Sequence, residues 1–143
     1  MSALAYHQDF YGWTQEQAKL LREHRIEELD LENLLEEIES MGKSEKRELE
    51  SRLELLLMNL LKWYYQPNFQ GKSWELTIRE QRAKSARHLM ENPSLKGKLN
   101  EDFEYAYDDA RMWAARETGL SLDTFPESCP WAFEQVIDPV FFP

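Results

Sequence analysis

The stretch EKRELESRLELLLMNLLKWYY, residues 45–65, decides the fold. From Leu49 to Leu61, apolar residues recur at every third or fourth position, which is the spacing of one face of an α-helix. This face comprises Leu49, Leu53, Leu56, Leu57, Leu60, Leu61 and Tyr64. Met58 and Trp63 make the C-terminal half apolar nearly all round, and such a helix is buried between other helices. We therefore predict that residues 45–65 form the central helix.

The segment before it is also helical in pattern. A helix start lies at Asp30, and the residues that follow it at helical spacing form one apolar face: Leu31, Leu34, Leu35, Ile38 and Met41. Gly42 is suited to end this helix, and Ser44 is suited to cap the next one. The apolar stripe nearly keeps its phase across this point, so one helix over residues 30–65 and two separate helices both fit the pattern.

Cap and stop signals predict further helices on both sides of this region, over residues 15–24, 74–91, 101–118 and 131–137. The predicted N-caps are Thr14, Ser73 and Asn100, and Gly119 fits a left-handed C-cap. No period-2 strand pattern occurs. The sequence therefore predicts an all-α fold, an irregular bundle of about five helices around a central buried helix with a Pro-bounded C-terminal tail. We predict a single helical domain over residues 1–143.

Composition excludes several classes of protein. The chain has 143 residues, 42% of them hydrophobic, which excludes a disordered chain. Its one cysteine excludes an intramolecular disulfide scaffold. The net charge of −10 disfavours general nucleic-acid binding, so no DNA partner is expected. No apolar run reaches the length of a membrane span, and residues 1–10 lack the pattern of a signal peptide. We expect a cytoplasmic protein.

Several short motifs are recognisable. They are DFYGWT at residues 9–14, LDLENLLEEIE at 29–39, LKW at 61–63, SW at 73–74, TIREQR at 77–82, NPSL at 92–95 and TFPESCPW at 124–131. With them the chain resembles the bacterial domain-of-unknown-function family number twenty-nine, which is common in cyanobacteria. The resemblance extends over nearly the whole chain from Asp9 to the C-terminus. It implies a helical fold, and it implies no activity, catalytic residue or cofactor.

Residues 23–39 hold eight acidic residues and one basic residue, Arg25, for a local charge of −7. A di-iron carboxylate bundle would need Glu-x-x-His motifs, because imidazole and carboxylate groups must converge on the ions. No such motif occurs, and the cysteine and histidines show no metal-binding spacing. We predict a solvated acidic face, with no metal and no cofactor.

Residues 72–98 reverse the sign, with seven basic residues against three acidic ones. Arg79, Arg82 and Arg87 form a candidate interaction face on this basic helix. Pairing with the acidic helix or with another subunit is the favoured interpretation, and docking of an acidic partner or a phosphate stays open. We expect these arginines to contribute little to folding and more to association.

Two patterns admit an enzymatic interpretation. Arg82 and His88 have the spacing found in HEPN ribonucleases, in which the arginine steadies phosphate charge and the histidine moves protons. The polar residue usual after that arginine is absent, because position 83 is alanine. Cys129 has no histidine near it in sequence, so a packed small residue is the favoured interpretation over a nucleophile. Trp63, Trp74 and the other aromatic residues are expected in the core rather than in a ligand pocket.

The sequence as a whole favours a non-enzymatic interaction or regulatory module that binds a protein partner or a second copy of itself. An antitoxin-like role, in which the acidic chain neutralises a basic partner, is one concrete version. The alternative is a metal-independent HEPN-like ribonuclease that uses Arg82 and His88. No catalytic, cofactor-binding or metal-binding residue is assigned.

Overall fold

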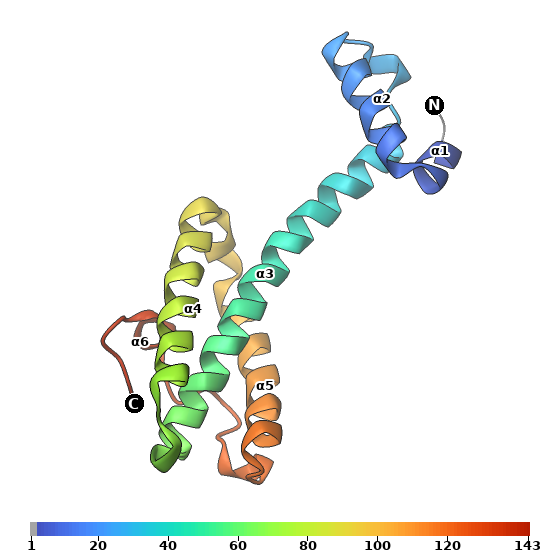
Figure 1. Ribbon diagram of the computed structural model, residues 1–143. Helices are drawn as coiled ribbons and strands as arrows, with labels where there is room; N and C mark the ends of the chain where they lie inside the picture. The colour runs from blue at the N-terminus through green and yellow to red at the C-terminus, as the bar shows by residue number, and fades with distance from the viewer. Residues whose placement is uncertain (1–2) are drawn as a thin grey trace. The chain divides into compact units, whose positions relative to one another are not determined.

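Helices account for 81% of the residues that the structure describes, which confirms the predicted all-α class. The structure is a computed structural model that describes residues 3–143, with side chains from residue 5 onward; this part holds no strand. Its α-helices are α1 (Ala3–Gln8), α2 (Phe10–Arg22), α3 (Leu31–Tyr65), α4 (Lys72–Glu91), α5 (Leu99–Thr118) and α6 (Phe133–Ile137) (Figure 1). Short 3₁₀ turns lie between them, at Ile26–Glu28, Pro67–Phe69, Pro93–Lys98 and Leu122–Thr124. Helix α1 is not among the helices predicted from the sequence.

Helix α3 is continuous over 35 residues, which decides between the two alternatives for residues 30–65. Gly42 lies within it, and a Cβ added there would have no atom within 4 Å. A glycine inside a helix costs roughly 1 kcal/mol relative to alanine, which is too little to end a helix with a continuous apolar stripe. Ser44 is therefore an internal helical residue and not a cap.

The chain divides into two compact units, Met1–Ser44 and Glu45–Pro143, called here the N-terminal unit and the C-terminal unit. Each is described by itself. A single domain over residues 1–143 stays a prediction. Within residues 3–143, no helix combines the length and the hydropathy that a membrane span requires.

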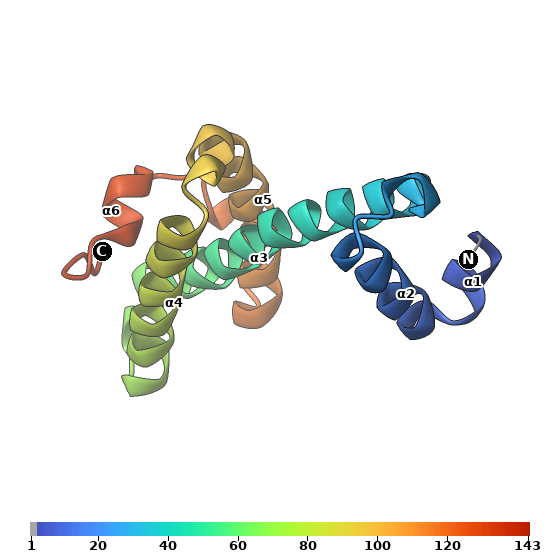
Figure 2. The same cartoon turned by 90° about the horizontal axis from the view of Figure 1, so that it is seen from above.

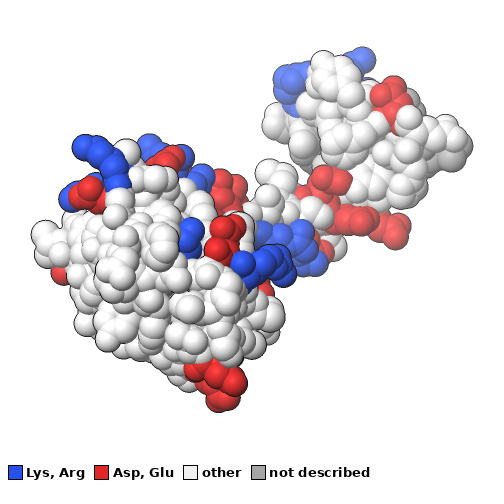
Figure 3. All heavy atoms as spheres, turned by 60° about the horizontal axis from the view of Figure 1, so that its bottom comes forward, with Lys and Arg blue, Asp and Glu red and all other residues white. Residues whose placement is uncertain are grey.

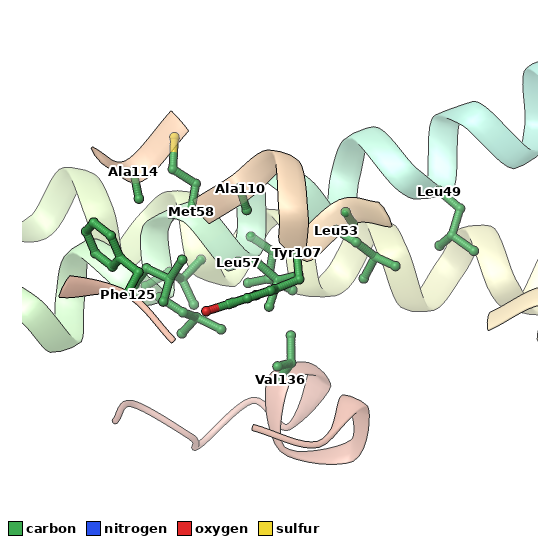
Figure 4. Packing of buried hydrophobic residues seen from close by; sticks show 14 of the residues in the cluster. Leu49, Leu53, Leu57, Met58, Tyr107, Ala110, Ala114, Phe125 and Val136 are labelled. Atoms are coloured by element: carbon green, nitrogen blue, oxygen red, sulfur yellow. The ribbon is translucent and has the colours of Figure 1, made fainter. Parts of the chain in front are cut away.

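The second half of α3 runs between α4 and α5 and forms the core of the C-terminal unit (Figures 1 and 2). The predicted leucine face is confirmed, because six leucines have no exposed surface: Leu49, Leu53, Leu56, Leu57, Leu60 and Leu61. Tyr107, Phe125 and Val136 complete this core from α5 and the C-terminal tail (Figure 4). Tyr64 is a partial exception to the predicted face, because it is half exposed and meets Trp131 at an edge.

The N-terminus of α2 differs from the prediction. The helix begins at Phe10, and its N-cap is Asp9, whose Oδ1 accepts a hydrogen bond of 3.0 Å from the backbone N–H of Gly12. A Cβ at position 12 would lie 2.3 Å from Asp9 Oδ2, so a side chain there would force the Asp9 carboxylate to shift from its capping position. Thr14 instead donates its hydroxyl to the carbonyl of Tyr11. The DFYGWT motif thus contains the cap, and the helix begins five residues earlier than the sequence predicted.

The other helix ends lie close to their predicted places. Helices α4 and α5 begin about two residues early, so Ser73 and Asn100 are helical residues and not caps. Gly119 ends α5 with a φ of +75°, as predicted for a left-handed C-cap. Helix α6 begins at Phe133, two residues later than predicted.

Candidate functional site

Exposed apolar side chains gather on the N-terminal unit beside a groove of about 290 Å³ between α2 and α3. The groove is lined by Phe10, Trp13, Thr14, Gln17, Ala18, Leu21, Leu34, Glu37, Ile38 and Met41. Along it, α3 presents a stripe of Leu31, Leu35, Ile38 and Met41, each 58–66% exposed. We call the groove with this stripe the apolar groove. The spacing of these residues correctly predicted a helix, but most of its apolar face has no covering element within the N-terminal unit.

A hydrogen-bond network around Asp30 holds α2 against the start of α3. Asp30 Oδ2 accepts from the indole Nε1 of Trp13 at 3.0 Å and from Asn33 Nδ2 at 2.8 Å. The backbone N–H of Asp30 donates to Gln17 Oε1 at 2.9 Å. Hydrogen bonds from Asn33 and then Trp13 lower the pKa of Asp30 below its usual value. The predicted helix start at Asp30 is confirmed, and the network fixes the wall of the apolar groove at Trp13.

Replacing Asp30 with alanine should destabilise the N-terminal unit by about 1–2 kcal/mol, because it removes the cap and two side-chain hydrogen bonds. Because the pKa of Asp30 is lowered in the folded state, its carboxylate stabilises the N-terminal unit at pH values above the unfolded-state pKa of about 4. This stabilisation is lost as the pH falls through the folded-state pKa. The indole N–H resonance of Trp13, followed by NMR from neutral to acidic pH, measures both effects. A variant with the pH dependence of the wild type would contradict this role for Asp30.

One carboxylate, Glu37, lines the apolar groove, and further carboxylates lie on α3 beside the apolar stripe. Of the eight acidic residues between positions 23 and 39, Glu23 and Glu28 pair with Arg25, at 2.9 Å and 2.5 Å. Tyr6 donates its hydroxyl to Glu37, and this hydrogen bond raises the pKa of Tyr6 to about 12. Three further carboxylates on α3 are exposed and have no ion pair within residues 5–143: Glu32, Glu36 and Glu39. The predicted solvated acidic face thus borders the apolar groove.

The three arginines of the candidate interaction face do not share one exposed surface. Arg79 is exposed and pairs with Glu75 at 3.0 Å, and Arg87 is exposed. Arg82 is only 3% exposed, so the expectation of a surface arginine is wrong at this position. On the visible face, basic side chains are interspersed with carboxylates and do not form one basic patch (Figure 3). An interaction role for Arg79 and Arg87 stays a prediction.

Arg82 binds the C-terminal tail. Its Nε donates to the carbonyl of Val136 at 2.7 Å, and its two Nη groups donate to the carbonyls of Pro139 and Phe141. Its guanidinium also lies over the ring of Phe142, 5.1 Å from the centroid. Burial lowers the pKa of Arg82 from its ordinary value. The side chain therefore closes the tail onto α4 and is not available to a partner.

Arg82 and His88 are not brought together. Arg82 faces the tail, whereas His88 faces Glu45 and Glu48 of α3, and the two side chains line different surface cavities. A ribonuclease site needs the phosphate-binding arginine and the proton-transfer histidine at one substrate. This arrangement gives no support to the HEPN-like alternative.

The cluster of Glu45, Glu48 and His88 is the only group of at least three potential metal ligands in the described residues, with ligand atoms within 4.8 Å of one another. His88 Nδ1 lies 2.6 Å from Glu48 Oε2, and Nε2 lies 2.8 Å from the carbonyl oxygen of Glu45. Both ring nitrogens thus already contact oxygens, and Arg52 lies 3.4 Å from the other carboxylate oxygen of Glu48. A divalent ion would have to displace these contacts, so the geometry favours a polar link between α3 and α4. The expectation of no bound metal stays a prediction.

Sequence analysis missed this link, because Glu45 and Glu48 show only a common i, i+3 spacing and their partner lies about forty residues away. It also missed the pair of Lys46 and Asp102, whose Nζ and Oδ1 lie 2.7 Å apart with Asp102 fully buried. The charged Asp102 carboxylate raises the pKa of Lys46, while burial raises the pKa of Asp102 itself. No local signal in the sequence identifies either contact.

Cys129 is not activated as a nucleophile. Burial raises the pKa of its thiol to about 11, so the thiolate that would attack a substrate is scarce at neutral pH. The helix that follows begins at Phe133 and not at Pro130, so no helix N-terminus directly follows the cysteine. The interpretation of Cys129 as a packed small residue agrees with this environment.

Comparison with known proteins gives one result. No curated protein and no solved structure matches the chain. A family model, described as a domain of unknown function and numbered DUF29, matches residues 5–142. Since this match covers nearly the whole chain, the protein belongs to the DUF29 family.

Proposed function

We propose that this chain is a non-enzymatic, cytoplasmic interaction module that binds a basic amphipathic helix of a partner protein in its apolar groove. The observation that carries the proposal is the exposed stripe of Leu31, Leu35, Ile38 and Met41 on α3. Contiguous apolar patches of this kind, rimmed by polar residues, mark protein interaction sites. An antitoxin-like role, in which a basic partner is neutralised, is one form of this function.

The spacing of the stripe supports a helical occupant. A helix that lies in a groove inserts anchors at positions i, i+3, i+4 and i+7, and the four exposed residues of α3 offer a matching row. The cavity beside the stripe holds space for one or two apolar side chains, with the rings of Phe10 and Trp13 in its wall. The groove thus offers both a row of contacts and a place for an anchor.

Charge supports a basic occupant. Glu32, Glu36 and Glu39 are exposed beside the groove and have no ion pairs in the described part of the chain. Lysine or arginine residues beside the apolar anchors of a partner would meet these carboxylates, and this complementarity favours orientation and fast association. A second copy of the chain would bring like charges together, which disfavours self-association through this face.

The test uses two designed helical peptides with the same leucine stripe, one flanked by lysines and one by glutamates. We expect the lysine peptide to bind, with an affinity that falls as salt is added, and the glutamate peptide not to bind. Replacing Ile38 with glutamine should weaken binding about tenfold or more, because it removes a central apolar contact. Fluorescence anisotropy of labelled peptides measures these affinities.

The matched control is Met90→Gln, which removes an even more exposed apolar side chain from α4. It should leave peptide affinity unchanged. Equal binding of both peptides, or equal loss in Ile38→Gln and Met90→Gln, would contradict the proposal. A dimer in light scattering that Ile38→Gln dissociates, without binding of either peptide, would assign the groove to a second copy instead.

A further inference from the structure

A second cavity lies in the C-terminal unit, between α5 and the loop at residues 127–131, with a volume of about 340 Å³. Three aromatic side chains line it: Phe103, Tyr107 and Trp131. We call it the aromatic pocket. The sequence analysis expected its aromatic residues in the core, and indeed all three are at least partly buried, but each also presents surface to this cavity.

The aromatic walls are held in place by packing. Tyr107 is buried in the core, where its side chain points from α5 toward the tail (Figure 4). Its hydroxyl donates to the carbonyl of Pro126 at 2.5 Å. Phe103 meets Phe133 edge to face, and Trp131 meets Phe141 in the same way. The rings are thus preformed, so a ligand would not have to order them.

Carboxylates are the only charged groups in the lining of the aromatic pocket. They are Glu104 and Asp108, one turn apart on α5, and Glu127 from the loop. None of the three has an ion pair or a hydrogen bond within the part of the chain that the structure describes, and no lysine or arginine lines the cavity. Like charges at i and i+4 repel on a helix, so a cation between them would relieve this repulsion.

The remaining polar groups of the pocket are neutral. Burial raises the pKa of Cys129 to about 11 and that of Tyr107 to about 12, so both keep their protons at neutral pH. The pocket therefore offers no thiolate to a soft metal ion and no nucleophile to a substrate. The pocket thus presents aromatic side chains and carboxylates.

We propose that the aromatic pocket binds an organic ammonium group, carried by a free amine or by a lysine side chain of a peptide. The faces of aromatic rings attract cations, and quaternary ammonium ligands are recognised in this way by aromatic cages. The three unpaired carboxylates add a negative potential that excludes anions. A neutral apolar ligand would gain from the rings but not from Glu104, Asp108 and Glu127.

The test compares choline with its neutral isostere 3,3-dimethylbutan-1-ol in NMR titrations of the full chain, followed at the indole resonance of Trp131. We expect choline to bind at least about tenfold more tightly than the isostere, since only choline gains from the carboxylates. A lysine-containing tripeptide and the same peptide with an acetylated lysine form a second arm. Tighter binding of choline than of the lysine tripeptide assigns the pocket to a free organic ammonium compound. Tighter binding of the lysine tripeptide assigns it to a lysine side chain of a peptide.

Substitutions separate specific binding from the general negative charge of the chain. Asp108→Asn should weaken binding of the cation about fivefold, the loss expected for one partly screened charge. The matched control is Asp109→Asn, which makes the same change on the next residue of α5, outside the lining. Equal binding of choline and its isostere, no binding of any cation, or equal losses in the two variants would overturn the proposal. These outcomes are independent of the peptide experiment on the apolar groove, which lies in the other unit.

Discussion

Replacing Leu57 with alanine is expected to lower the free energy of unfolding of the C-terminal unit by about 2–5 kcal/mol. Leu57 has no exposed surface and lies in the cluster that joins α3 to α4, α5 and the tail. The substitution removes apolar atoms from this core and leaves a cavity, since neighbouring helices collapse only in part into the space. Leu60 is equally buried, and Leu60→Ala should show a loss in the same range.

Urea denaturation followed by circular dichroism measures this loss. The control is Leu76→Ala on α4, where the leucine is more than half exposed, and the expected change is below about 0.5 kcal/mol. Similar small changes in Leu57→Ala, Leu60→Ala and Leu76→Ala would mean that residues 45–65 do not form the central helix. A change in the slope of the denaturation curve would indicate that unfolding is no longer two-state or that the compactness of the denatured state has changed.

The sequence predicted the central helix because burial leaves a local pattern there. Leucines at helical spacing with further apolar residues on the opposite side fit only a helix with neighbours all round. The left-handed C-cap at Gly119 was likewise predictable, since φ of +75° there favours glycine. These features depend on residues within one or two helical turns of each other.

The apolar face of α3 before Gly42 shows where such patterns stop being informative. Leu35 and Ile38 have the same spacing as the buried leucines of the second half of the helix, yet they are exposed. Spacing defines an apolar face but not whether another element of the same chain covers it. The acidic residues and the apolar stripe were both visible in the sequence, but the groove between α2 and α3 was not.

Contacts between distant segments account for the error at Arg82 and for the sites that the sequence did not reveal. Arg82 looked like a surface residue because it lies among basic residues on an amphipathic helix, but its hydrogen-bond partners are 54–59 residues away. The aromatic pocket likewise joins Phe103 and Tyr107 to Trp131, and His88 meets Glu48 across two helices. A single sequence contains no local record of such pairs, so the candidate sites emerged only from the structure.

Replacing Arg82 with methionine is expected to release the C-terminal tail and to lower the free energy of unfolding by about 2–4 kcal/mol. The guanidinium donates to the carbonyls of Val136, Pro139 and Phe141 from a buried position. Methionine fills a similar volume but donates no hydrogen bond, so three carbonyl groups would lose their donor. Hydrogen bonds from a charged group contribute more than neutral ones, and buried acceptors without a donor are costly.

Hydrogen exchange of the tail amides, residues 133–142, measures the release directly. Arg79→Met is the matched control, because Arg79 lies one turn away on α4, is exposed, and also contacts the ring of Phe142. Arg79→Met should lower the free energy of unfolding by less than about 1 kcal/mol, since an exposed ion pair contributes little to stability. Arg82→Lys should recover only part of the stability, because an ammonium group does not reproduce the planar fork that spans three carbonyls. If the tail amides exchange as slowly in Arg82→Met as in the wild type, Arg82 does not anchor the tail and again becomes a candidate for the interaction face. If they exchange faster in Arg82→Met but not in Arg79→Met, Arg82 is the residue that anchors the tail.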